Sequence, residues 1–308
     1  MVSIVTKRIK GNEYMYLVES VRQGDKVMQR TVKYIGRKRP VPAHEFECMK
    51  ISHARKDWLL TRFRDELPYQ DHKRMSAASE QHRRYLNSLD RVSREKEKER
   101  FLSSFIANSN AIEGSTLTVK DTFNYLFNDI TPGSHKKKEL FMATNLLEAW
   151  NYLEKNHKRL PEEKDLMAMH SIVNKWIEPE NTLGRYKQVQ NYIGDVYTTS
   201  YLFTKERMKD LMGWIRKAPK KIDDFEVAFQ SHAQFETIHP FVDGNGRVGR
   251  LLLNWLLMNK GLTPLAIRSE RRNEYINALS NAQKGKMEAI CRFCFDEYIN
   301  QYRFEKTD

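Results

Sequence analysis

Cysteine is scarce in this chain, with only three among its 308 residues. Three cysteines are too few for a disulfide framework and agree with a reducing compartment. Long apolar runs are also missing, since none reaches the roughly 18 residues that a membrane-spanning helix needs. The first ten residues, MVSIVTKRIK, lack the apolar stretch of a secretory signal peptide. These absences predict a cytoplasmic protein that neither spans a membrane nor depends on disulfides.

Zinc-binding signatures are almost as scarce. Cys291 and Cys294 form a single C-x-x-C without a second pair, and they lie in a stretch with the spacing of an amphipathic helix. We therefore expect no zinc site. Internal repeats and low-complexity tracts are missing too, and 40% of the residues are hydrophobic. The composition is typical of one large or two modest globular domains.

Acidic residues are too few to balance the basic ones, and the net charge is +13. Residues 1–40 hold ten Lys or Arg and three acids, a net charge of +7 (10 − 3). This segment has the pattern of three short strands, with Tyr14, Tyr16 and Tyr34 between basic residues. It loosely resembles the N-terminal strands of some transposase-like proteins. Such a surface can bind a nucleic-acid backbone, although a docking domain that recruits a protein target explains the pattern equally well.

Charge and periodicity divide the chain into three segments. Residues 1–40 form the small basic β-strand domain, and residues 41–100 form a charged helical connector. Residues 101–308 have helical spacing throughout most of their length. The sequence therefore predicts a mainly α protein that is preceded by a small β meander.

The residues that can take part in catalysis or ligand binding are concentrated in the segment 239–250, HPFVDGNGRVGR. The segment places a base, a carboxylate, a glycine-rich turn and two arginines next to one another. The apolar stretch 247–261 that follows has helical spacing, so the amides of the turn lie at the positive end of a helix, where anions bind. These amides belong to Gly244, Asn245 and Gly246.

The side chains around the turn suit the handling of phosphates. Arg247 and Arg250 are three residues apart and can each offer a planar fork of donors to phosphate oxygens. Asp243 is a hard oxygen ligand for magnesium, and His239 can accept a proton. The segment is not a Walker A loop, which needs a lysine, and it is not a Rossmann fingerprint, because residues 225–238 ahead of it have helical spacing.

The motif His-x-Phe-x-Asp/Glu-Gly-Asn-Gly-Arg-x-x-Arg is matched at every defined position by residues 239–250. On this match the chain resembles the Fic family over roughly residues 100–300. The resemblance implies an all-helical core with a short β-hairpin flap. It also implies transfer of AMP from ATP to a protein hydroxyl, with magnesium as cofactor. By this resemblance His239 is the general base, Asp243 holds the metal, and Phe241 anchors the core. The phosphates are then bound by Gly244, Asn245, Gly246, Arg247 and Arg250.

A second family feature lies upstream of the motif. Residues 109–114, SNAIEG, match the inhibitory-helix pattern Ser/Thr-x-x-x-Glu-Gly/Asn. The resemblance implies that Glu113, with Ser109 at the start of the pattern, pairs with Arg250. The carboxylate then occupies the guanidinium that would otherwise bind the γ-phosphate of ATP. Relatives of this type carry the inhibitory helix ahead of the core, and some also remove AMP. The sequence does not indicate which direction dominates.

Two further segments carry weaker resemblances. Residues 184–194 alternate like a strand and turn, and resemble the flap that holds a target segment in extended form. The family often has arginine where Lys187 stands. Tyr275 and Gln283 fall near the adenine pocket of the family, which favours adenine without establishing it. A tyrosine at helical spacing is also typical of a core position.

Two functions from different classes therefore compete. The first is a self-inhibited AMP transferase that acts on a Ser, Thr or Tyr hydroxyl of a protein, including its own chain. The second is a nucleic-acid-binding regulator whose Fic core only senses nucleotide. The resemblance is also compatible with a homodimer, while no membrane partner is expected. The motif binds phosphates and not bases, so other nucleotides stay open.

Overall fold

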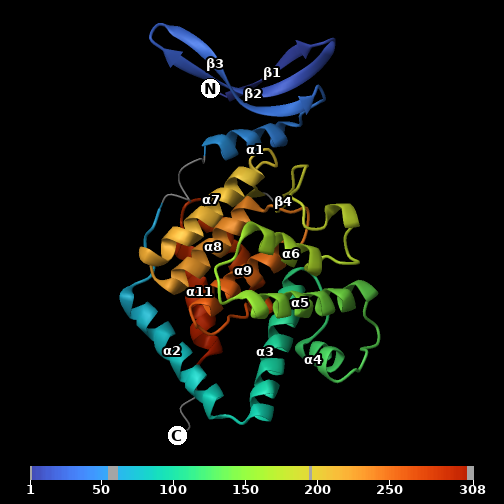
Figure 1. The fold of residues 1–308 in the computed structure, drawn as a ribbon, viewed down its shortest axis with the longest axis vertical. Coiled ribbons are helices and arrows are strands. Elements are labelled where there is room, and N and C mark those ends of the chain that lie inside the picture. Colours follow the sequence, from blue (N-terminus) through green and yellow to red (C-terminus); the bar gives the residue numbers. More distant parts are fainter. Residues whose placement is uncertain (1, 55–61, 194–195, 304–308) are drawn as a thin grey trace.

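The computed structural model describes residues 2–54, 62–193 and 196–303 (Figure 1). A small sheet lies at one end of the molecule, with helix α1 (Ala43–Ala54) directly beneath it (Figure 1). The other helices pack into one body, from which α2 and α3 extend farthest from the sheet (Figure 1). The mainly α fold with an N-terminal β meander is therefore confirmed.

The N-terminal sheet is an antiparallel meander of three strands in the order β1-β2-β3. The strands are β1 (Val2–Ile9), β2 (Asn12–Gln23) and β3 (Lys26–Arg37). Gly11 and Gly24 occupy the two tight turns with φ values of 81° and 62°, a backbone region that glycine enters without steric cost. The three strands that the sequence predicts are confirmed.

One face of the sheet packs onto the helices. Met15 and Leu17 alternate along β2, so both point to the same side of the sheet, and both are buried. Together with Ile35 they contact Met49 of α1 and Phe203, just ahead of α7. This small apolar cluster joins the meander to the helical body.

The helical body contains ten longer helices within the described ranges. They are α2 (Tyr69–Ser88), α3 (Arg91–Ile112), α4 (Val119–Phe127), α5 (Lys137–Asn156), α6 (Glu163–Val173), α7 (Thr204–Lys217), α8 (Asp224–Ile238), α9 (Asn245–Asn259), α10 (Arg272–Gln283) and α11 (Glu288–Gln301). The boundary that the sequence suggests at 100/101 lies inside α3, so this helix runs from the charged connector into the segment that carries Glu113.

Helices α8 and α9 form the centre of the body. Every residue of α8 from Phe225 to Ile238 is buried, because α8 packs against α7, α9, α10 and α11. Gly249 lets α9 approach α8 closely, since a Cβ at this position would lie 2.2 Å from Glu236 Oε1. The helices expected at 225–238 and 247–261 are confirmed as α8 and α9. The loop between them, residues 239–244, carries the motif.

The flap differs in extent from the expectation for residues 184–194. The strand β4 covers only Tyr192–Ile193 and pairs with β5 (Val196–Tyr197), while the expected strand over 184–191 is wrong. The backbone amide of Lys187 donates to the carbonyl of Pro240, and the side chain of Asn191 donates to the carbonyl of Phe241. Because these groups are tied to the motif loop, this segment cannot form a regular strand pair.

Cys291 and Cys294 lie in the expected helix, α11, where both are buried and free. Across the described ranges, none of the helices combines the length and the apolar character that crossing a bilayer requires.

Candidate active site

His239 caps the C-terminus of α8 in a strained conformation. Its φ and ψ are 50° and 62°, in the left-handed region that a non-glycine residue rarely adopts. Such strain persists only where the surroundings hold it, and it gathers at functional sites. His239 Nδ1 is buried and lies 3.7 Å from Glu236 Oε2. The strained backbone therefore turns the imidazole toward a buried carboxylate one helical turn earlier.

The side chain of Asn245 holds the motif loop together. Its Oδ1 accepts a hydrogen bond from the amide of Phe241 at 2.8 Å, and its Nδ2 donates to the carbonyl of the same residue at 2.9 Å. Both polar ends of the amide are therefore used inside the loop. The sequence predicts that Asn245 binds phosphate, but in the structure only its backbone amide remains for that task.

The start of α9 supplies the anion-binding amides. Gly244 is the residue that caps this helix, with a φ of 75°, and its amide donates to Asp243 Oδ1 at 2.6 Å. The first intrahelical bond runs from Val248 to Gly244, so the amides of residues 245–247 have no carbonyl partner within the helix. These amides and the helix dipole together attract an anion.

One residue of α6 and the residue that caps its C-terminus support the loop from behind, and the sequence did not indicate either role. His170 stacks on Phe241 with ring centroids 4.0 Å apart, and its Nε2 lies 3.1 Å from the carbonyl of Asp243. Its Nδ1 accepts a hydrogen bond from Gly184. Burial lowers the pKa of His170 to about 4, so the ring is neutral. Asn174, one turn later, donates to the carbonyl of Asp243 as well.

Arg250 is held by Ser109 of α3 and by Glu113, which caps the C-terminus of this helix. Its Nη2 donates to Glu113 Oε1 at 2.7 Å and to the carbonyl of Ser109 at 2.8 Å, while its Nε donates to Ser109 Oγ at 2.8 Å. Burial lowers the pKa of Arg250, but the neighbouring Glu113 carboxylate more than offsets this effect and the net shift is upward. The guanidinium is therefore charged, buried and already paired.

Gly246 makes room for this pair. A Cβ at position 246 would lie only 2.2 Å from Glu113 Oε1 and 3.1 Å from Arg250 Nη1. Glycine is therefore required for the carboxylate to approach the start of α9, where an anion would otherwise bind.

Arg247 points in a different direction from Arg250. Its Nη2 donates to Asn174 Oδ1 at 3.0 Å and its Nη1 to the carbonyl of Val173 at 3.4 Å. The side chain is 2% exposed. The sequence predicts both arginines on one helical face toward the phosphates. In the structure the Arg247 guanidinium is bonded to residues at the end of α6, whereas that of Arg250 is bonded to Ser109 and Glu113.

A cavity opens between the motif, the end of α3 and α10. His239, Glu236, Glu113 and Arg250 line it, and Ile112, Ile276 and Leu279 supply an apolar wall. This combination of an apolar wall and a few convergent polar groups is typical of a small-molecule site.

Both residues assigned to the base pocket line this cavity as well. The Tyr275 ring stacks parallel to His232, and its hydroxyl lies 2.6 Å from His232 Nε2. Gln283 Nε2 donates to the carbonyl of Tyr197 in the flap at 2.8 Å. The Tyr275 ring is thus fixed at the wall of the cavity, and the Gln283 side chain links the cavity to the flap.

Asp243 lies at the surface of the loop. Its side chain is 48% exposed, with Oδ1 bonded to the amide of Gly244 and Oδ2 4.0 Å from Arg247. An exposed carboxylate oxygen next to an anion-binding helix start fits magnesium, which binds one or two carboxylates plus substrate phosphates and keeps several waters.

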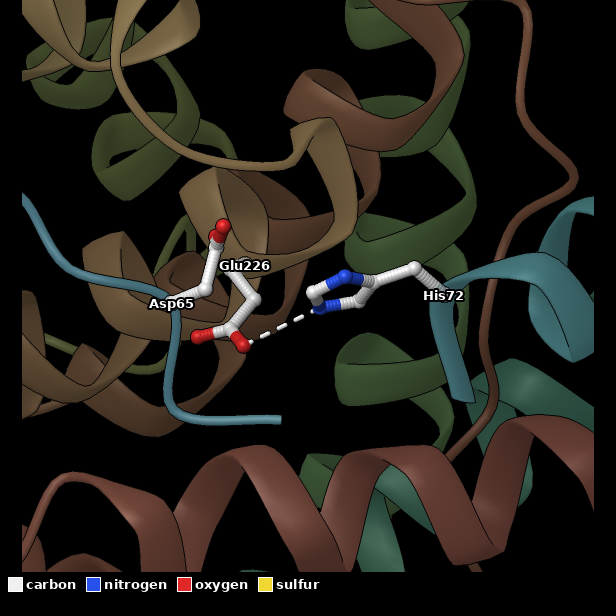
Figure 2. Close-up of side chains that lie close together, drawn as sticks. All are labelled: Asp65, His72 and Glu226. Atoms are coloured by element: carbon white, nitrogen blue, oxygen red, sulfur yellow. Dashed lines mark hydrogen bonds and ion pairs between the residues drawn. The ribbon is translucent and has the colours of Figure 1, made fainter. Parts of the chain in front are cut away.

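A second group of potential ligands, Asp65, His72 and Glu226, lies outside the motif (Figure 2). Glu226 Oε1 accepts hydrogen bonds from the backbone amides of residues 66–67 at 2.8 and 2.6 Å, and His72 Nε2 lies 3.1 Å from it. Gln230 donates to Glu226 Oε2. Because donors already surround this carboxylate, the group serves to fasten the segment ahead of α2 onto α8.

Comparison with known proteins places the motif in a family. Residues 160–257 match the Fic/DOC family. Residues 2–52 match the N-terminal domain of the IS1634 family of transposases.

Among its relatives, the chain is 30% identical over 209 residues to the protein adenylyltransferase Fic of Nematostella vectensis, covering 66% of this chain and 49% of that protein. It is 31% identical over 195 residues to the protein adenylyltransferase fic-1 of Caenorhabditis elegans, covering 61% of this chain and 38% of that protein. The chain thus spans less than half the length of either relative.

The fold has solved counterparts. A structure of Fic-1 from C. elegans superposes with a TM-score of 0.65 at 26% identity, covering 76% of this chain and 71% of that one. The helical body, the motif loop and the matches in sequence agree with one another, and residues 160–257, which include the motif, match the Fic/DOC family.

Proposed function

We propose that this chain is a self-inhibited protein adenylyltransferase, which transfers AMP from ATP to a Ser, Thr or Tyr hydroxyl of a protein. The observation that carries the proposal is the convergence of His239, Arg250 and Glu113 on one cavity, next to the free amides at the start of α9. The names of the relatives, which are protein adenylyltransferases, support the same reaction.

Different groups of the site carry out proton transfer, charge stabilisation and binding of the target segment in this reaction. His239 accepts the proton of the target hydroxyl as its oxygen attacks the α-phosphorus of ATP. A new oxygen–phosphorus bond forms, and the bond between the α-phosphorus and the bridging oxygen breaks, so that pyrophosphate leaves. The amides of residues 245–247 and the Arg250 guanidinium stabilise the negative charge on the phosphates. The flap, β4 and β5, pairs with the target segment in extended form.

Magnesium is the cofactor that this arrangement suits. Asp243 would hold the ion through its exposed carboxylate, together with phosphate oxygens of ATP. When bound, the ion supplies positive charge that neutralises the phosphates and orients them.

Adenine is the base that we propose for the apolar wall of the cavity. Ile112, Ile276 and Leu279 provide apolar contact surface, and the buried Tyr275 ring lies beside them. The phosphate-binding groups themselves do not distinguish ATP from UTP or GTP, so the preference for adenine depends on this wall and on Gln283.

Self-inhibition follows from the pairing of Glu113 with Arg250. A carboxylate on the guanidinium adds negative charge where a phosphate would bind and withdraws the donors that would hold it. The same glutamate could orient a water for removal of AMP, so both directions of the chemistry belong to the proposal. The chain itself and a second copy are candidate targets alongside other proteins.

The alternative is a nucleic-acid-binding regulator whose core only senses nucleotide. The two functions differ in their dependence on His239. A regulator keeps its function in the His239→Ala variant, whereas a transferase loses turnover while ATP still binds.

The deciding experiment measures the transfer of label from ATP radiolabelled at the α-phosphate in a cell extract. The proteins compared are the wild type, Glu113→Gly and the double variant Glu113→Gly with His239→Ala, each with magnesium and with EDTA. Protein-bound label should rise in the single variant and vanish in the double variant or without metal. If ATP binds to Glu113→Gly but no protein is labelled, the transferase function is wrong for ATP.

A further inference from the structure

The outer face of the N-terminal sheet carries two aligned rows of side chains. Val5, Tyr16 and Tyr34 are register partners across the three strands. Lys7, Tyr14 and Arg37 form the neighbouring row. Tyr14 and Tyr16 are two residues apart on β2, so both rows point to the same side of the sheet. Met15, which lies between them in sequence, points to the opposite side and is buried against the helices.

The tyrosines of these rows form one cluster. The Tyr34 ring lies 5.3 Å from that of Tyr16 and 6.1 Å from that of Tyr14, and the Tyr34 residue is 52% exposed. Lys7 Nζ lies 5.0 Å from the centroid of Tyr16. The sheet therefore displays partly exposed aromatic surface beside cationic groups.

The cations of this face have no acidic partners within the described residues. Three other basic residues of the sheet are neutralised, since Arg30 pairs with Glu19, Lys38 with Glu13 and Lys33 with Glu206. Neither Lys7 nor Arg37 takes part in any such pair across the described ranges, and both are exposed. The two cations beside the tyrosines are thus available to contact an anionic ligand.

The core of the molecule does not cover this surface. The opposite face of the sheet contacts α1 and Phe203, and the helical body lies beyond them (Figure 1). A ligand on the outer face would therefore leave the cavity around His239 open.

We propose that this outer face, formed by Lys7, Tyr14, Tyr16, Tyr34 and Arg37, binds single-stranded nucleic acid. Bases stack on tyrosine rings, and cations beside the rings contact the phosphates. A single strand fits better than a duplex, because only unpaired bases can turn their faces to a flat aromatic surface. The match of residues 2–52 to a transposase domain is consistent with a nucleic-acid ligand.

The test measures the fluorescence anisotropy of a labelled 20-nucleotide oligothymidylate with the full chain at increasing salt. RNA of the same length and a duplex serve as parallel probes, and together they identify the preferred ligand. The double variant Lys7→Ala with Arg37→Ala should bind at least about tenfold more weakly. The salt dependence should also weaken. The slope of log affinity against log salt should become less negative by about 1.4, or about 0.7 for each phosphate that the variant no longer neutralises.

Two further variants separate stacking from charge. Tyr34→Ala, at an exposed position, should weaken binding about tenfold while leaving the salt slope unchanged. A control that removes the same charge elsewhere, Lys155→Ala with Lys158→Ala, should bind like the wild type, because both lysines lie outside the sheet. Absence of oligonucleotide binding at low salt, equal or tighter binding of the duplex, or equal losses in the control would each overturn the proposal.

Discussion

The Glu113 carboxylate lies 2.7 Å from the Arg250 guanidinium, although 137 positions separate the two residues in sequence. The Glu113 side chain remains 31% exposed while that of Arg250 is 3% exposed. The pair therefore joins a buried cation to a carboxylate at the rim of the cavity, and the carboxylate is the partner that can leave.

Replacing Glu113 should release the site. The Glu113→Gly variant removes the carboxylate from Arg250, so label transfer from ATP should rise by about tenfold or more, equivalent to about 1.4 kcal/mol. The Glu113→Gln variant keeps a hydrogen-bond acceptor but loses the charge, so its rise should be smaller. Initial rates of labelling at matched ATP concentrations compare the two. Equal rates in all three proteins would show that Glu113 does not restrain the site.

A buried glutamate next to the proposed base should also matter. Burial raises the pKa of Glu236, but the neighbouring His239, together with His232 and Arg250, lowers it below its ordinary value. Glu236 is thus a carboxylate throughout the usual assay range, and it stabilises the imidazolium that forms when His239 takes a proton. We infer that Glu236 is a positioning residue for His239.

The Glu236→Gln variant, made in the Glu113→Gly background, tests this role. Turnover should fall by about 10- to 100-fold, with little change in the KM for ATP. A purely structural role would also raise the KM for ATP or lower the stability of the protein. The Glu236→Asp variant, which keeps the carboxylate, should recover part of the turnover that Glu236→Gln loses.

The sequence predicted the elements better than the side-chain directions. The helices around the motif follow from apolar spacing, and the meander follows from Gly11 and Gly24. Whether a polar side chain of the motif faces the cavity or the protein depends on partners that lie far away in sequence. Asn245 is used by the loop itself, and Arg247 by Asn174, 73 positions away. Spacing within one helix cannot reveal such partners.

Close packing of α8 and α9 gives a prediction on stability. In the Gly249→Ala variant the new Cβ would lie 2.2 Å from Glu236 Oε1 and 3.0 Å from His232 Nδ1. Both neighbours are buried, so relief requires a shift of packed groups, and the free energy of unfolding should fall by about 1–3 kcal/mol.

A matched control exists in α7. Gly213 is also inside a helix, but a Cβ there meets no described heavy atom within 4 Å. The Gly213→Ala variant should raise the free energy of unfolding by up to about 1 kcal/mol through helix propensity. Urea unfolding of both variants checks the prediction, and equal effects at the two positions would contradict the packing argument.

Lys187 gives the protein a specific dependence on pH. Its ammonium is buried between the flap and the motif, donating to Asn191 Oδ1 at 2.6 Å, and it lies 3.4 Å from the carbonyl of Ile238. Burial lowers its pKa from 10.5 to about 7. Below pH 7 both the folded and the unfolded chain carry the charge, so the cost of burying it is fully present.

Above pH 7 the folded chain loses this proton while the unfolded chain keeps it up to about pH 10.5. The unfolded state then binds more protons, so stability must rise with pH. The Lys187→Met variant lacks this group, and its free energy of unfolding relative to the wild type should therefore be most favourable at pH 6 and decline toward pH 9. Urea titrations at pH 6, 7.5 and 9 measure the difference, with Lys155→Met as the control outside the flap. A difference that stays constant across this range would mean that Lys187 titrates alike in both states.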